Sequence, residues 1–371
     1  MEPPTTNVRK STVVTALTLV VGVWCMLALV DRYVLGAFVP TVVTPRFEPA
    51  HLRLADRTSN HNLSILFAAT EERIAAHQHV VAVVGDSTVM AFGERDDFSL
   101  TEQISRAVAR QPNLDTKVTV AEFAALGLPT DEALVLVSKA LGIGVDLVVY
   151  AITPRVICDL PQRLNDVANH LMDSDVAKLL GPRFLLQNYS PAALASGAVQ
   201  AHWALLRFRH EINSALTQWT SSFLGFNLPL STPANYVVPA MPRLPMSVFF
   251  WTHKNCRLDA SNQRVQAFIR LADTCAASGR CLFYFGPINQ SAMARFEPGL
   301  VGEFSLWARG ILRERRVPFR NYSYLVPENG FLRGPLGQWD AIHLNVFGRQ
   351  RLANLLGPEI AHALEQRQSP I

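Results

Sequence analysis

The run Val80-Val81-Ala82-Val83-Val84, followed by Gly85-Asp86-Ser87, is the strongest indication of the fold in this chain. Its five apolar residues are nearly all β-branched, as in a strand that is buried on both faces of a parallel sheet. Helical and strand-like segments then alternate along the chain, which predicts an α/β fold with right-handed crossovers. We expect a three-layer α/β/α sandwich around a mostly parallel five-stranded sheet. Further strands are predicted at 117–121, 146–152, 281–285 and near 318, and helices at 100–110, 130–141, 262–277, 291–313 and 346–365.

The alternation is interrupted between about residues 158 and 246, so we predict an insertion within one domain that spans 79–371. Five prolines between Asn227 and Met246 end any helix there. The insertion could cover the active site, touch a membrane, bind a partner or simply pack on its host domain. Earlier in the insertion, apolar residues at helical spacing form one face: Leu205, Phe208, Ile212, Leu216, Trp219 and Phe223.

The N-terminal segment Thr12–Val30 has no charged side chain and is close to the length of a membrane-spanning helix. Arg9 and Lys10 precede it, which favours a cytoplasmic N-terminus. A cleaved signal peptide is the alternative, but its apolar region is usually shorter and ends in a small-x-small site that is not found here. We therefore predict a single-pass protein of the inner membrane with a periplasmic or other extracytoplasmic domain. The predicted parts are a tail (1–11), an anchor (12–30), a stalk (31–78) with a helix at 62–77, and the domain 79–371.

Charge and cysteine content exclude two other classes of protein. The net charge of +4 arises from 34 basic and 30 acidic groups and is dispersed, so we expect no nucleic-acid partner. Five cysteines are too few for a disulfide scaffold. Cys275 and Cys281 flank a short helix-to-strand turn and could pair in an oxidising compartment, or they could be ordinary buried thiols.

Near the end of the chain, Asp340-Ala341-Ile342-His343 places a carboxylate three residues before an imidazole. With Ser87 these residues supply a hydroxyl to attack, a base to take its proton and an acid to orient that base. We expect Asp340 and His343 in the loop before the last helix, for which Asn345 is a candidate N-cap. Open α/β sheets bind ligands at the carboxyl ends of their strands, so these three groups can meet. No neighbouring residue completes a metal site, and we expect neither a metal nor a cofactor.

These two blocks resemble those of the SGNH, or GDSL, hydrolase family. The likeness covers 80–364 apart from the insertion, with Gly85-Asp86-Ser87 as the first block and Asp340-Ala341-Ile342-His343 as the last. It implies a serine-dependent acyl-ester hydrolase or acyltransferase, in which Ser87 is the nucleophile, His343 the general base and Asp340 the orienting acid. It also implies an oxyanion hole formed by the backbone N–H groups of Gly127 and Ser87.

The third block of the family departs from the pattern here. The family has Gly-x-Asn-Asp after its third strand, whereas this chain reads Tyr150-Ala151-Ile152-Thr153-Pro154. No asparagine stands there to complete the oxyanion hole. Asn289 follows the strand at 281–285 on the same sheet edge and could supply an amide, or it could merely satisfy a turn.

The departure, the anchor and the insertion together resemble a membrane-anchored subgroup of the family. This subgroup includes the D-alanyl transfer protein of teichoic-acid modification and the alginate O-acetylation proteins, which work beside a polytopic membrane-bound O-acyltransferase. The resemblance implies an enzyme that moves an acyl group, such as acetyl, through an acyl-serine to a hydroxyl of a polysaccharide or of the cell envelope. Two alternatives remain: an anchored esterase or deacetylase that acts alone, and a non-catalytic partner of the membrane acyltransferase.

Overall fold

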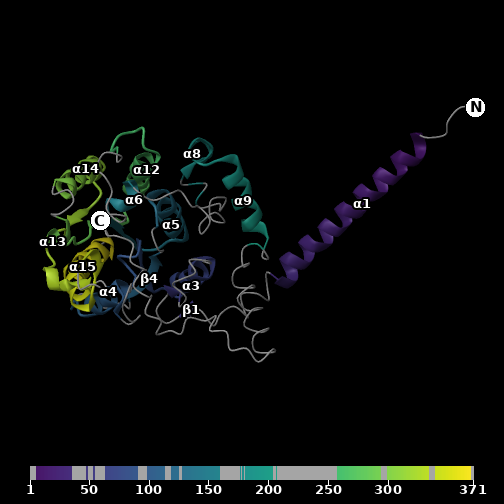
Figure 1. The fold of residues 1–371 in the computed structure, drawn as a ribbon. Coiled ribbons are helices and arrows are strands. Elements are labelled where there is room, and N and C mark those ends of the chain that lie inside the picture. The colour runs from purple at the N-terminus through teal and green to yellow at the C-terminus, as the bar shows by residue number, and fades with distance from the viewer. Residues whose placement is uncertain are drawn as a thin grey trace, which may run out of the picture.

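A computed structural model describes this chain over residues 6–35, 47–48, 53–54, 63–90, 98–112, 118–124, 128–158, 176, 178, 180–203, 206, 257–293, 299–333 and 339–368. One long helix, α1 (Thr6–Val30), projects from an α/β body (Figure 1). It continues into a π-helical turn at Asp31–Leu35. Among the described helices, one is apolar and long enough to cross a membrane, with its span at Val14–Val34. This helix overlaps the predicted anchor at 12–30. The orientation of the helix and the identity of the membrane stay predictions.

The body is built on a five-stranded, all-parallel sheet in the order β4-β3-β5-β6-β7. The strands are β3 (His79–Gly85), β4 (Val118–Ala124), β5 (Leu147–Ile152), β6 (Cys281–Phe285) and β7 (Phe319–Asn321). The chain crosses from β3 outward to β4 and then returns to β5 on the other side of β3. The point between β3 and β5 is therefore the place where the winding reverses, and such points are where open α/β sheets bind ligands.

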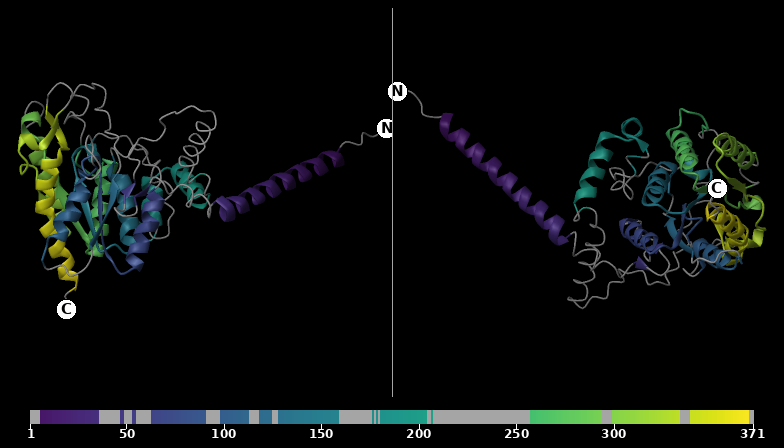
Figure 2. Two further views of the ribbon diagram at one scale, coloured as in Figure 1. Left: turned by 90° about the horizontal axis from the view of Figure 1, so that it is seen from below. Right: turned by 180° about the vertical axis from the view of Figure 1, so that it is seen from behind.

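Helices cover both faces of the sheet, which confirms the predicted three-layer α/β fold (Figure 2). Because successive residues of a strand point to opposite faces, Val80, Ala82 and Val84 belong to one apolar core and Val81 and Val83 to the other. The first core is closed by α3 (Leu63–Ala75), α5 (Thr130–Ile143), α12 (Gln263–Ser278) and α14 (Leu300–Glu314). The second is closed by α4 (Leu100–Ala109) and α15 (Val346–Gln368).

The remaining described elements are short. They are the antiparallel pair β1 (Phe47–Glu48) and β2 (Arg53–Leu54), the helices α6 (Arg155–Cys158), α8 (Pro182–Asn188), α9 (Pro191–His202) and α13 (Gln290–Met293), a 3-10 turn at Glu328–Gly330, and the antiparallel pair β8 (Phe331–Arg333) and β9 (Trp339–Leu344). The single helix predicted at 291–313 is thus two helices, α13 and α14, and residues 294–298 lie outside the described part. In the predicted insertion, α8 and α9 are described, whereas the apolar face predicted at 205–223 lies outside the described residues.

Two expectations about local structure need correction. Asp340 and His343 lie in strand β9 and not in a loop, because β9 pairs with β8 (Phe331 opposite Leu344) and the Asn289 N–H donates to the Ala341 carbonyl. Helix α3 falls in the predicted stalk but packs on the sheet. Its Phe67 ring stacks on Phe123 of β4 with a centroid distance of 4.5 Å, so α3 belongs to the core. The predicted N-cap of α15 is confirmed, since Asn345 Oδ1 accepts from the Gly348 N–H.

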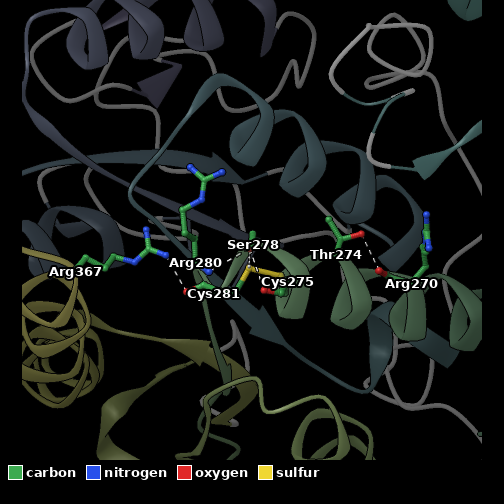
Figure 3. The surroundings of a disulfide bond; sticks show 8 residues. Arg270, Thr274, Cys275, Ser278, Arg280, Cys281 and Arg367 are labelled. Atoms are coloured by element: carbon green, nitrogen blue, oxygen red, sulfur yellow. Dashed lines mark hydrogen bonds between the residues drawn. A yellow bond between two sulfur atoms is a disulfide. The ribbon is translucent and has the colours of Figure 1, made fainter. Parts of the chain in front are cut away.

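A disulfide joins the end of α12 to the start of β6, between Cys275 and Cys281 (Figure 3). Gly279, at φ 61°, ends the helix and reverses the chain between the two cysteines. The Arg280 side chain donates to the Leu141 and Val145 carbonyls, and so ties this turn to α5. The bridge lies at the amino ends of the strands, at the opposite edge of the sheet from Ser87.

Replacing both Cys275 and Cys281 with serine is expected to lower the free energy of unfolding by about 2 kcal/mol, as for a bridge that closes a short loop. Activity at 25 °C should be unchanged, because the bridge is remote from the triad. Urea unfolding of the full-length protein in detergent measures the difference. Equal unfolding midpoints for the double variant and the oxidised parent would contradict a stabilising bridge.

Candidate active site

Three side chains from distant parts of the sequence form one hydrogen-bonded chain. Ser87 Oγ lies 2.8 Å from His343 Nε2, and His343 Nδ1 lies 3.0 Å from Asp340 Oδ2. Ser87 follows β3 at the carboxyl edge of the five-stranded sheet, and the other two residues reach it from β9, which belongs to the separate pair β8–β9. The structure thus brings the three predicted residues together in the order of a serine nucleophile, its base and an orienting acid.

The surroundings of Asp340 determine which imidazole nitrogen carries the proton. Burial opposes ionisation of this carboxyl, but the attraction of His343 and the hydrogen bonds from His343 and Ile342 outweigh it and hold the pKa of Asp340 below its usual value. Both backbone N–H groups donate to Oδ1 at 2.8 Å. An ionised carboxylate can only accept, so Nδ1 of His343 carries the proton and Nε2 is left to accept from Ser87.

The turn that presents Ser87 is held by the neighbouring carboxylate, Asp86. Its Oδ1 accepts from the backbone N–H of Thr88 at 2.9 Å and from the Thr88 hydroxyl at 2.7 Å. Its Oδ2 accepts from Thr153 Oγ at 3.3 Å, and all these groups are buried or partly buried. Asp86 therefore links the ends of β3 and β5, and both of its carboxylate oxygens are bonded to the scaffold.

Thr153 is a residue of this site that sequence reasoning did not single out. It stands at the end of β5, where the SGNH pattern has an asparagine, and its hydroxyl is bonded to Asp86. The signal in the sequence was a hydroxyl residue directly after a buried strand, at the same sheet edge as Ser87. The pattern could not show which group it would contact.

Buried tyrosines near Asp86 do not supply a second base. Burial raises the pKa of both Tyr150 and Tyr284, and the nearby charge of Asp86 raises each of them further. Both hydroxyls therefore stay protonated at neutral pH. His343 remains the group at this site that is bonded to Ser87 and able to accept its proton.

Because Gly85 has no side chain, the turn before Ser87 can pack closely against Val89 and against Ala151 of β5. A Cβ at this position would overlap the Val89 side chain and lie 3.0 Å from Ala151 Cβ of β5.

Gly85→Ala is expected to displace Ser87 from His343 and to lower kcat by about 10²-fold, the scale of a 1 Å misplacement. Steady-state kinetics with a model acetyl ester measure this. The matched control is Gly286→Ala at the end of β6, where a Cβ meets nothing nearer than 4.0 Å; equal losses in the two variants would contradict the steric argument.

Asn289 is bonded to the scaffold. Its amide nitrogen donates to the Asp340 carbonyl at 3.1 Å, and its Oδ1 accepts from the backbone N–H groups of Ser291 and Ala292. These bonds fit the turn-satisfying role considered for this asparagine and tie α13 to the strand that carries the acid. The predicted oxyanion role of Asn289 stays a prediction, as does that of the Ser87 N–H. Gly127 lies outside the described residues.

Asn289→Ala separates the two roles. The change removes bonds to buried backbone groups, so we expect the free energy of unfolding to fall by about 1–3 kcal/mol. Chemical denaturation, read together with kcat and KM, checks this. A drop in kcat at unchanged stability and KM would instead identify Asn289 as a donor to the oxyanion.

Known proteins resemble this chain only distantly. No protein-family model matches the chain, and no curated protein matches it. Similar solved structures include TesA, at 12% identity and a TM-score of 0.40, covering 77% of this chain and 99% of that chain. Another is a lipase/acylhydrolase from Enterococcus faecalis, at 12% identity and a TM-score of 0.37, covering 77% and 96%. These likenesses are too low to carry an argument, so the functional assignment rests on the fold and on the triad.

Proposed function

We propose that this chain is a membrane-anchored acyltransferase that carries an acyl group on Ser87 and passes it to a hydroxyl of an extracytoplasmic polysaccharide or envelope polymer. The observation that carries the proposal is the continuous chain from Ser87 Oγ through His343 to Asp340, at 2.8 and 3.0 Å. Both distances are within the range that general-base catalysis requires. The apolar helix Val14–Val34 supports the anchoring.

The chemistry follows from the tautomer of His343. Nε2 takes the Ser87 proton while Oγ forms a bond to the acyl carbon, and the same proton then leaves with the departing group of the donor. In the second half, Nε2 takes the proton of the acceptor hydroxyl, whose oxygen binds the acyl carbon. The bond to Ser87 Oγ breaks, and the proton returns to Ser87.

Transfer to a sugar hydroxyl requires a bound acceptor that competes with water for the acyl-serine. Ser87 is 4% exposed and His343 is 7% exposed, which limits the approach of water and of a sugar alike. The preference for a sugar hydroxyl is therefore based on the resemblance to the membrane-anchored subgroup of the SGNH family. We further propose a polytopic membrane-bound O-acyltransferase as the partner that delivers acyl groups from the cytoplasm.

The test uses the purified full-length protein in detergent, with 4-nitrophenyl acetate as donor and a panel of soluble polysaccharides as acceptors. We expect an acetyl-Ser87 adduct by mass spectrometry, and with a productive acceptor we expect acetylated polymer and faster nitrophenol release. Nitrophenol release that no acceptor alters, with acetate as the product, would identify an esterase. The absence of any Ser87 adduct, also with a fluorophosphonate probe, would leave a non-catalytic partner of the membrane acyltransferase as the function.

A further inference from the structure

An arginine lies at the end of the strand irregularity that contains the acid and the base of the triad. Arg333 of β8 is opposite Trp339 of β9. The next pair in the ladder is Phe331 and Leu344, so one residue of β8 stands opposite the four residues 340–343 of β9. The extra residues form a bulge in β9, and the pair of Arg333 and Trp339 closes one end of it.

The Arg333 side chain is held by the ring of Trp339. The guanidinium carbon lies 4.0 Å from the centroid of that ring. The face of an indole attracts a cation, so this contact restricts a side chain that would otherwise be free to move. Paired residues of an antiparallel ladder have Cα atoms about 5 Å apart, and consecutive residues have theirs about 3.8 Å apart. The Cα atom of Arg333 is therefore within about 9 Å of the Cα atom of Asp340.

The charge of Arg333 is not neutralised by a carboxylate in the described part of the chain, and its side chain is exposed. Other arginines of the body are paired: Arg315 with Asp273, and Arg320 with Glu359, both at 2.6 Å. A guanidinium has its N–H donors in one plane, and a stacked ring covers its face and not its edge. The edge of Arg333 is therefore able to donate two parallel hydrogen bonds to a carboxylate or a phosphate.

From these observations we propose that Arg333, held on Trp339, binds an anionic group, a carboxylate or a phosphate, of the polymer on which the triad acts. The inference rests on the proposed function and names a substrate class for it. A polymer that reaches Ser87 extends beyond the reacting unit, so its neighbouring units can bind to groups near the triad. Binding energy gained there holds the reacting hydroxyl at the acyl-serine and favours it over water.

The test measures the binding of short oligomers to the full-length protein in detergent by isothermal titration calorimetry. All variants are built on Ser87→Ala, so that no ligand is consumed. The ligands are oligogalacturonate, which carries carboxylates; its methyl ester, which is the same chain without charge; and a glycerol phosphate oligomer, which carries phosphates. We expect one anionic oligomer to bind more tightly than the methyl ester, and its identity distinguishes a carboxylate polymer from a phosphate polymer.

The variants locate this preference at Arg333. Arg333→Gln is expected to weaken the binding of the preferred anionic oligomer about tenfold, the scale of one charge-assisted contact. Arg333→Lys keeps the charge without the planar fork and should lie between the two. Trp339→Leu should weaken the same binding, because the guanidinium is no longer held. The matched control is Arg313→Gln, which should bind like the parent. Arg313 is also exposed, but it lies at the end of α14, shortly before β7 begins, at the opposite edge of the sheet from Ser87.

The outcomes separate this inference from the proposed transfer. Equal affinities for the charged oligomers and the methyl ester overturn the anion site, as do equal losses in Arg333→Gln and Arg313→Gln. A charge preference that survives Trp339→Leu in a protein folded by circular dichroism overturns the role of the ring. Binding that depends on Arg333, together with no acetylated polymer from the enzyme that retains Ser87, overturns the transferase and leaves the anion site standing.

Discussion

Alanine in place of Ser87 is expected to lower the rate of acyl transfer by a factor of about 10⁴ or more, because Ser87 Oγ is the atom proposed to carry the acyl group. The substitution removes one oxygen whose described bond is to His343 Nε2, so the fold should be kept. Loss of acetylated polymer and of the acyl-enzyme adduct, measured with equal amounts of folded protein, checks the prediction.

The matched control is Ser323→Ala. Ser323 is also buried, but its hydroxyl donates to Asn321 and takes no part in the triad. This variant should keep its turnover and its labelling by a fluorophosphonate. Turnover by Ser87→Ala within tenfold of the parent would show that the chemistry runs through another residue.

Asparagine in place of Asp340 is expected to lower kcat/KM by about 10⁴-fold while preserving the structure. The amide oxygen can still accept from the backbone N–H groups of Ile342 and His343, as Oδ1 of the acid does. Its NH₂ group, however, would face Nδ1 of His343 as a donor. The imidazole would then place its proton on Nε2, where it can no longer accept from Ser87.

The pH dependence of stability provides a second readout of Asp340. Its pKa is lowered in the folded protein, so its charged form stabilises the fold above the ordinary carboxyl pKa, and this contribution is lost as the pH falls through the lowered value. The parent should therefore be more stable than Asp340→Asn at neutral pH, with the difference shrinking in acid. Urea unfolding at several pH values measures it. A difference that is constant with pH, or a loss of kcat/KM below tenfold, would contradict this role.

Much of the fold was predictable from local pattern. The buried run before Gly85 predicted β3, and the alternation of strands and helices predicted the five-stranded sheet, because the period of the apolar residues reflects which faces are covered. The acid and imidazole blocks were expected to meet Ser87 at the carboxyl edge of the sheet. They do meet it, but from β9 of the separate antiparallel pair β8–β9 and not from the end of a parallel strand. The structure confirms that the three side chains meet, whereas their catalytic roles remain to be tested.

Contacts between distant segments were not predictable in this way. The strand character of Asp340 and His343 depends on pairing with β8, which is short and has no strong pattern of its own. The place of α3 in the core depends on the edge strand β4, where the Phe67 ring stacks on Phe123. Local periodicity says that a helix has an apolar face, but it does not say which surface that face covers.

The α/β class, the apolar N-terminal helix and the three residues of the triad could be inferred from the sequence alone, because strand burial, helix length and side-chain chemistry are local properties of the chain. The support of the triad became visible only in the tertiary structure: Asp86 is held by Thr88 and Thr153, and Asn289 is tied to the Asp340 backbone. So did the ring contact between Trp24 of α1 and Trp203 at the end of α9. Hydrogen bonds and ring contacts of this kind depend on distances between segments that are far apart in the chain, and these distances exist only once the sheet and its helices have packed.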